Sequence, residues 1–188
     1  MELTHDTGWA LVSEWTQAPH LLRHMLAVEA SMRAYARRFG EDEDKWGFVG
    51  LVHDFDYERH PNLDQNGHPL VGTKYLREHG APDDVIQAIL SHAGEYTGVH
   101  AESRLDKTLI AVDELTGFIT AVTLVRPSKQ IADVQVSSIK KKWKAKEFAA
   151  AVNRQEIEHA AESIGVGLDE HIGVVLNAMK SIAPSLGL

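Results

Sequence analysis

The amino-acid sequence predicts an all-α fold, and two patterns lead to this prediction. Apolar residues recur every three or four positions through most of the long segments, which is the spacing that places them on one face of a helix. Residues that end or begin helices separate these segments, because glycine follows several of them and proline or acidic residues open the next. The 188 residues, 44% of them hydrophobic, suffice for one domain with a sizeable core, and we expect residues 1–188 to form it.

Three helices are expected in the N-terminal quarter. Residues 8–16 form a short amphipathic helix, and residues 19–39 form a longer one that Pro19 opens and Gly40 ends. An acidic run at residues 41–44 precedes the third helix, from about residue 45 to residue 52. We interpret this run as a solvated first turn that the helix dipole favours, rather than as a calcium site.

The middle of the chain alternates between polar loops and helices. Turn-forming residues mark the first loop, and Pro127 ends the longest helix. The expected order is a loop at residues 55–67, helices at about 67–79 and 82–92, a second loop at 95–104, and a helix at about 105–125.

The C-terminal part begins with a strongly basic stretch at residues 139–146. A nucleic-acid-binding patch there is one interpretation, but an isolated basic segment on an acidic protein is more often a solvated surface. Two further helices are expected at residues 153–164, which begins like a capping box, and at residues 168–182. We expect these helices to pack over the preceding ones.

Four polar residues stand in apolar helical surroundings and need partners. His53 and Asp54 are adjacent at the end of an apolar helix, while His24 and Asp113 each interrupt an apolar run. A buried carboxylate without a partner is strongly disfavoured, and a divalent metal takes imidazole nitrogen and carboxylate oxygen together. The alternatives are a histidine bonded to a backbone carbonyl and an arginine or lysine as the counter-charge of Asp113.

Two further histidines are expected to lie close to each other. His68 lies at the N-terminal end of one expected helix and His92 at the C-terminal end of the next. These two ends are adjacent in an antiparallel helical hairpin, which favours shared chemistry. The two histidines would bind a second metal ion, bind substrate phosphate, or have a structural role.

The order of the four residues, His24, then His53 with Asp54, then Asp113, resembles the HD superfamily of metal-dependent phosphohydrolases. The resemblance covers about residues 21–120. It implies a single helical HD-domain bundle with its core at about residues 19–127 and C-terminal helices, residues 128–188, packed on it. The glycine-tyrosine-proline signature of the cyclic-di-GMP phosphodiesterase branch is absent, so we do not expect that substrate.

With His68 and His92 added, the order resembles the HD branches that hold two metal ions. It implies that Asp54 bridges both ions and orients the activated water, that His24, His53 and Asp113 complete one coordination sphere, and that His68 and His92 serve the other. Nitrogen and carboxylate ligands suit Mn, Fe, Co, Ni or Zn. We therefore expect one or two divalent transition metal ions and hydrolysis of a phosphate ester in a nucleotide or a small phosphorylated metabolite.

Two alternatives share this ligand set. Some HD relatives with the same ligand order use two irons to oxidise carbon with O₂. A non-catalytic, metal-binding regulatory protein is the other alternative, and the presence of all six residues argues against it. For substrate binding we name Arg59 and His60 in the first loop and Lys107 after the second, because polar loops beside a metal site often contact substrate.

Charge and composition limit the partners. The formal net charge of −8 does not favour nucleic acid or anionic membranes as partners, and no apolar stretch approaches the roughly 20 residues that a spanning helix needs. The chain has no cysteine, which excludes disulfides, thiolate metal sites and a cysteine nucleophile. Its first residues do not resemble a signal peptide, so we expect a cytoplasmic protein with a small-molecule substrate.

Overall fold

The computed structural model, which describes residues 1–188, contains eleven α-helices, one 3₁₀-helix and no strand, and it confirms the all-α prediction. The helices are α1 (His5–Trp15), α2 (Pro19–Phe39), α3 (Glu43–Val52), α4 (Leu70–Glu78), α5 (Asp83–His92), α6 (Gly94–Thr97), α7 (Arg104–Leu124), η1 (Ile131–Asp133), α8 (Val136–Trp143), α9 (Arg154–Ser163), α10 (Leu168–Ser181) and α11 (Ala183–Leu186). None of them is both long and apolar enough to cross a membrane.

Local sequence signals explain where the main helices begin and end. Pro19 opens α2, and Gly40 ends it in the left-handed conformation, with a φ of 70° that glycine adopts without strain. The side chain of Asp42 accepts a hydrogen bond from the backbone N–H of Lys45 (3.0 Å) and so caps α3. Ser103 and Asp106 form a capping box at the start of α7. Part of the acidic run before α3 therefore caps that helix.

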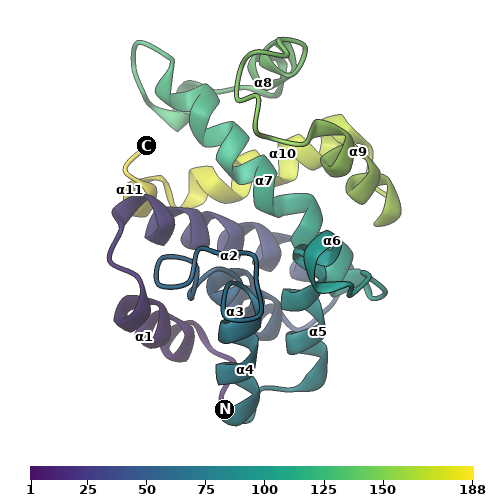
Figure 1. Ribbon diagram of the computed structural model, residues 1–188. Helices are drawn as coiled ribbons and strands as arrows, with labels where there is room; N and C mark the ends of the chain where they lie inside the picture. Colours follow the sequence, from purple (N-terminus) through teal and green to yellow (C-terminus); the bar gives the residue numbers. More distant parts are fainter.

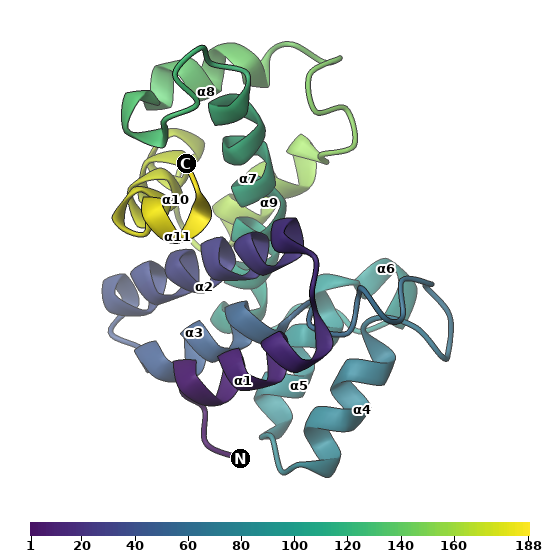
Figure 2. The same cartoon turned by 90° about the vertical axis from the view of Figure 1, so that its left-hand side faces the viewer.

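Helix α2 lies at the centre of the molecule. In both ribbon views α10 and α3 lie on opposite sides of α2 (Figures 1 and 2). Helix α1 lies on the same side of α2 as α3 and packs against α3. Helix α7 packs against α2 and α5, and it continues past them to α8, α9 and α10. The long helices α2 and α7 therefore connect the N-terminal and C-terminal parts of the fold.

One hydrophobic cluster of 40 buried residues runs through both parts, from Leu11 in α1 to Leu186 in α11. Gly50 brings α3 close to α2, because a Cβ at this position would lie 2.9 Å from Met32 Cγ and 3.0 Å from Glu29 Cα. This close approach places the C-terminal end of α3 beside α2.

A buried histidine joins α10 to the two long helices. His171 Nε2 donates a hydrogen bond to the carbonyl oxygen of Ala111 (2.8 Å), so Nδ1 accepts the hydroxyl proton of Tyr35 (2.6 Å). Burial lowers the pKa of His171 to about 4, and the bond to Ala111 opposes this shift only in part. His171 is therefore a neutral internal connector.

The structure differs from the expected elements in several places, since α1 begins at His5 rather than at residue 8 and the short helix η1 was not expected. Helix α4 begins at Leu70 rather than near residue 67, and His68 lies in the turn before it. A short helix, α6, forms inside the second expected loop, and α11 follows the last expected helix. Four-residue helices carry too little periodic pattern for sequence to reveal them.

The basic stretch of the sequence lies mostly on α8 and the turn that follows. Lys140 pairs with Asp169 of α10 (2.5 Å), and the ammonium group of Lys142 lies 4.8 Å from the ring centroid of Phe148. Part of the positive charge of the basic stretch therefore interacts with other residues of the same chain.

Candidate metal centre

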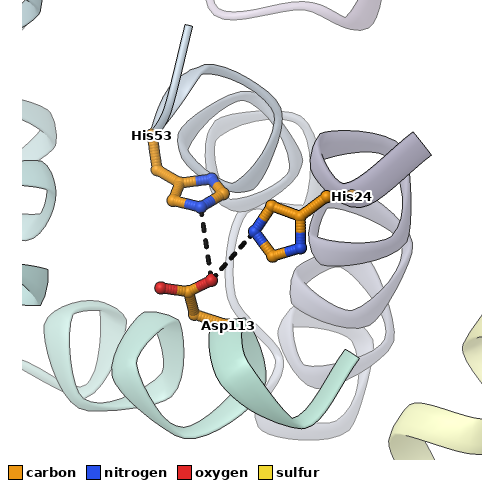
Figure 3. A group of neighbouring side chains, drawn as sticks. All are labelled: His24, His53 and Asp113. Atoms are coloured by element: carbon orange, nitrogen blue, oxygen red, sulfur yellow. Dashed lines mark ion pairs between the residues drawn. The ribbon is translucent and has the colours of Figure 1, made fainter. Parts of the chain in front are cut away.

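Three helices bring His24, His53 and Asp113 together, and we call these residues the helix group (Figure 3). His24 comes from α2, His53 caps the C-terminus of α3, and Asp113 lies in the middle of α7. Asp113 Oδ1 lies 3.0 Å from His24 Nε2 and 3.4 Å from His53 Nε2. The three side chains thus point at one position from three directions.

The other three predicted ligands form a second group, Asp54, His68 and His92, which we call the loop group. Asp54 follows α3 in a turn, His68 lies in the turn before α4, and His92 is the last residue of α5. The Nε2 atoms of His68 and His92 are 3.1 Å apart. The expected meeting of these two helix ends is therefore present in the structure.

Asp54 lies between the two groups and turns one oxygen to each. Its Oδ2 is 3.8 Å from His24 Nε2 and 3.5 Å from His53 Nε2. Its Oδ1 is 3.3 Å from His68 Nε2 and 3.5 Å from His92 Nε2. This is the arrangement that a carboxylate needs in order to bind two cations at once.

Hydrogen bonds fix the tautomers of three histidines. The Nδ1 atoms of His53 and His92 contact the carbonyl oxygens of Gly50 (2.8 Å) and Ile89, which only accept, so each Nδ1 carries the proton. His68 Nδ1 likewise donates to the carboxylate of Asp56 (2.7 Å). The Nε2 atom of each ring therefore faces the centre, and once it carries no proton it has the lone pair with which imidazole binds a metal.

His24 is oriented by a side chain of α7. The hydroxyl of Thr116 donates to the carbonyl oxygen of Asp113 (2.8 Å), so it accepts a hydrogen bond from His24 Nδ1 (3.2 Å). His24 then also presents its Nε2 atom to the centre. All four histidines thus direct their Nε2 atoms toward the carboxylates of Asp54 and Asp113.

The charges of the centre depend on one another. Burial opposes the charged form of His53, but the carboxylates of Asp54 and Asp113 outweigh it and raise the pKa of His53 to about 9. Burial alone would raise the pKa of Asp113, yet the neighbouring His53 and His24 hold it well below its usual range. The centre therefore concentrates negative charge that a cation can balance.

A metal fits this set of residues. His53 is fully buried, and its Nε2 has no hydrogen-bond partner although burying a free polar atom is costly. Divalent transition metals bind such nitrogen and carboxylate ligands. The groups His24, His53, Asp113 and Asp54, His68, His92 could each hold an ion, since the ligand atoms within a group lie within 4.8 Å of one another.

Asp56 contacts the candidate centre, although sequence reasoning did not name it as part of the centre. Its side chain is buried, with Oδ1 on His68 Nδ1 (2.7 Å) and Oδ2 accepting the backbone N–H of Gly72 (2.6 Å). It orients His68 and ties the loop to α4. The signal in the sequence was an aspartate between Phe55 and Tyr57, two residues after the His-Asp pair.

Asp106 lies two helical turns before Asp113 and belongs to the capping box of α7. In the structure its carboxylate accepts hydrogen bonds from the backbone N–H groups of Glu102 and Ser103, both at 3.0 Å. It therefore secures the start of α7.

The three residues named for substrate binding belong to neither group. The Cζ atom of Arg59 lies 4.8 Å from the ring centroid of Trp15, and the ring of His60 is 6.3 Å from the same indole. Lys107 lies in the first turn of α7 and is partly buried. Arg59 and His60 contact α1 in the structure. That these three residues bind substrate stays a prediction.

The loop between the His-Asp pair and α4 is closed at its base. The backbone N–H of His68 donates to the carbonyl oxygen of His60 (2.8 Å), so the residues between them bulge outward. Within the bulge, a Cβ on Gly67 would lie 1.7 Å from the carbonyl oxygen of Asn62, which makes glycine necessary there. The base of the loop thus holds His68 in place.

Two cavities of different chemical character reach the centre. One of about 220 Å³ lies between α2, α7 and the C-terminal residues and includes His24 in its wall. The other, about 50 Å³, is lined by His92 and Asp113 and by the carboxyl groups of Glu114 and Glu156. Burial raises the pKa of Glu114, and desolvation with the nearby charges of Glu95 and Asp113 raises that of Glu156. The second side of the centre is therefore acidic.

Comparison with known proteins gives one finding. A family model described as HD domain matches residues 21–117, which is just over half of the chain and includes all six residues of the two groups. Neither the curated proteins nor the solved structures contain a significant match to the chain.

Proposed function

The chain belongs to the HD domain family, and from this premise we propose that it is a metal-dependent hydrolase that cleaves a phosphate ester in a nucleotide or a small phosphorylated metabolite. The position of Asp54 supports the proposal most strongly. Its two oxygens face separate pairs of histidine nitrogens, at 3.5 and 3.8 Å on one side and at 3.3 and 3.5 Å on the other. A carboxylate so placed serves as a bridging ligand.

The residues of the chain have distinct parts in this proposal. Divalent ions, when bound, supply Lewis-acid activation of water and of the phosphoryl oxygens. His24, His53 and Asp113 hold one position and His68 and His92 the other, while Asp54 joins both. Side chains behind the ligands, Asp56 and Thr116, keep the imidazole rings turned toward the centre.

Partial exposure of the centre agrees with a catalytic role. The side chains of Asp54 and Asp113 are 18% and 21% exposed, whereas His53 behind them is fully buried. A purely structural metal site is usually closed by four protein ligands, while a catalytic one keeps a position open to substrate. The centre thus has both firmly held ligands and an accessible side.

The experiment is a measurement of bound metal together with phosphate release. The protein is purified without chelator or affinity-column metal, its metal content is determined by mass spectrometry, and a panel of phosphate esters is assayed with Mn, Fe, Co, Ni and Zn. We expect close to two equivalents of metal and metal-dependent phosphate release. The variant Asp54→Ala should lose both, because it removes the ligand that the two positions share.

The matched control is His159→Ala, which removes an exposed histidine of α9 that lies outside both groups. It should retain metal content and activity. Full metal content and activity in Asp54→Ala would contradict the bridging role. Oxygen uptake by the iron-loaded protein without phosphate release would instead indicate the oxygenase alternative, and a protein that binds none of the five metals would favour a non-catalytic role.

A further inference from the structure

The packing of the protein does not explain why residue 117 of α7 is a glycine, Gly117. Glycine weakens the interior of a helix relative to alanine. Its backbone is not in the left-handed region, and a Cβ added to it would meet no atom within 4 Å. Neither backbone conformation nor close contact therefore requires glycine. The absent side chain leaves open space beside the helix at this position.

This open space belongs to the larger of the two cavities. Gly117 lies in its wall, one helical turn after Asp113, and His24 lies in the wall contributed by α2. The missing side chain at residue 117 leaves room in the cavity that His24, a member of the helix group, also lines. A molecule held at the centre could therefore extend past Gly117 into the cavity.

The remaining wall combines three leucines with the polar residues His20, Arg23 and Thr120. Leu124 of α7 and Leu186 and Leu188 near the C-terminus line it, and Leu124 is 48% exposed although it is a large aliphatic residue. Arg23, which also lines the cavity, is the cation nearest to Gly187, since a Cβ there would lie 3.4 Å from its Cζ. An anionic molecule with a small apolar group suits this combination of one cation and several leucines.

We propose that this cavity binds the leaving group of the substrate, and that the substrate is a phosphate monoester of a small, mainly apolar alcohol. The proposal rests on the function proposed above and adds the substrate class to it. The phosphate lies at the two groups of ligands, and the organic part lies along Gly117 toward Leu124 and Leu186. Hydrolysis at this site breaks the P–O bond, with water giving its oxygen to phosphate and a proton to the departing alcohol. The volume of about 220 Å³ is below the range of about 300–1,000 Å³ that is common for drug-sized ligands, which favours a small organic part.

The test measures binding separately from hydrolysis. Methyl-, butyl- and hexylphosphonate, which cannot be hydrolysed, are titrated into Mn²⁺-loaded protein by calorimetry. We expect affinity to rise about fourfold for each methylene that enters the cavity. In Gly117→Leu the ratio of hexyl to methyl affinity should fall close to one, because the added side chain occupies the same space.

Folding of the variant is checked by circular dichroism and by metal content. Residue 117 is exposed, and a side chain there meets open space, so the variant is expected to fold. Asn177→Leu is the matched control, since it adds a leucine at an exposed helical position in α10 outside the cavity. It should keep the dependence on chain length that the unmodified protein has.

Several results would overturn the proposal: no phosphonate binds, affinity does not change with chain length, or Gly117→Leu keeps the full dependence. Phosphate release from methyl and hexyl phosphate is measured in parallel. Chain-length-dependent binding without any hydrolysis would leave the cavity assignment in place and contradict the proposed function. Hydrolysis of both esters at equal rates, with equal binding, would contradict the cavity assignment and support the proposed function.

Discussion

The two halves of the candidate metal centre are built in different ways. Packed helices position the helix group, because α2, α3 and α7 each contribute one side chain, and the close approach of α3 to α2 at Gly50 brings His53 beside His24. Turns position two of the three residues in the loop group, and the hydrogen bond that His68 donates to Asp56 holds His68 there. The difference teaches that one half depends on the hydrophobic core and the other on local polar contacts.

The largest effect is expected when a ligand of either half is removed. Asp113→Asn should lose the ion of the helix group, and His92→Gln that of the loop group, so each variant should bind one equivalent of metal less than the unmodified protein. Hydrolysis should fall by more than about 100-fold in both, since both positions are needed for catalysis. Metal content and phosphate release measure these effects. Loss of both ions in each variant would show that the two halves do not bind metal independently.

The stability of the core that positions the helix group can be tested by changing the pH. The pKa of His171 is about 4 in the folded protein and near 6.5 when unfolded, so the unfolded chain binds more protons between these values. The contribution of neutral His171 is therefore complete above about pH 6.5 and is lost as pH falls, with up to about 3 kcal/mol lost near pH 4. Urea unfolding at pH 7.5 and pH 4.5 measures the change.

His171→Gln provides the comparison, because it removes this titrating group while the remaining acids and histidines stay. The variant should be less stable at neutral pH but lose less stability on acidification. Equal losses in both proteins would assign the acid sensitivity to other groups.

The local polar support of the loop group is expected to give an intermediate effect. Asp56→Asn removes the negative charge behind His68 and should lower metal affinity by about 10–100-fold. Competition with a chelator measures the affinity, and the loss should be confined to one of two bound ions. Asp64→Asn, an exposed change in the same loop, should leave both affinities unaltered. A loss of both ions in Asp56→Asn would contradict the local role of this aspartate.

The smallest effects distinguish two glycines. Gly50→Ala should destabilise the fold by about 1 kcal/mol or more, since its Cβ would crowd Met32 and the backbone of Glu29. Gly117→Ala should stabilise it by about 0.5–1 kcal/mol, because a Cβ there meets nothing and alanine is the better helix former. Thermal unfolding measures both. The same sign of change in both variants would contradict the packing role of Gly50.

Sequence located the helices that carry the helix group because each signal was local, while metal binding by these residues stays a prediction. The spacing of apolar residues and the stops at Gly40 and near Pro127 located α2 and α7, and a polar residue inside each apolar run identified His24 and Asp113. The single-domain organisation, with a core at about residues 19–127 and an extension at 128–188, remains our inference, and the shared hydrophobic cluster supports it.

Features that depend on contacts between residues far apart in the sequence were harder to predict. The bond between Asp56 and His68 spans 12 positions, and no periodicity reveals it. Glu156 reaches the edge of the centre from α9, which lies outside the matched family region at residues 21–117. Arg59 and His60 were named because their loop follows the His-Asp pair, whereas the indole of Trp15 determines where both side chains lie.

The closed base of the loop before α4 affects how the sequence of this loop can change during evolution. The hydrogen bond from His68 to His60 separates the segment in between from the ligands on either side. Loops with fixed ends tolerate insertion at little cost, because closure entropy grows slowly with length. Residues 61–66 can therefore vary in sequence and in length, as long as Gly67 is kept, while the six residues of the two groups stay in place.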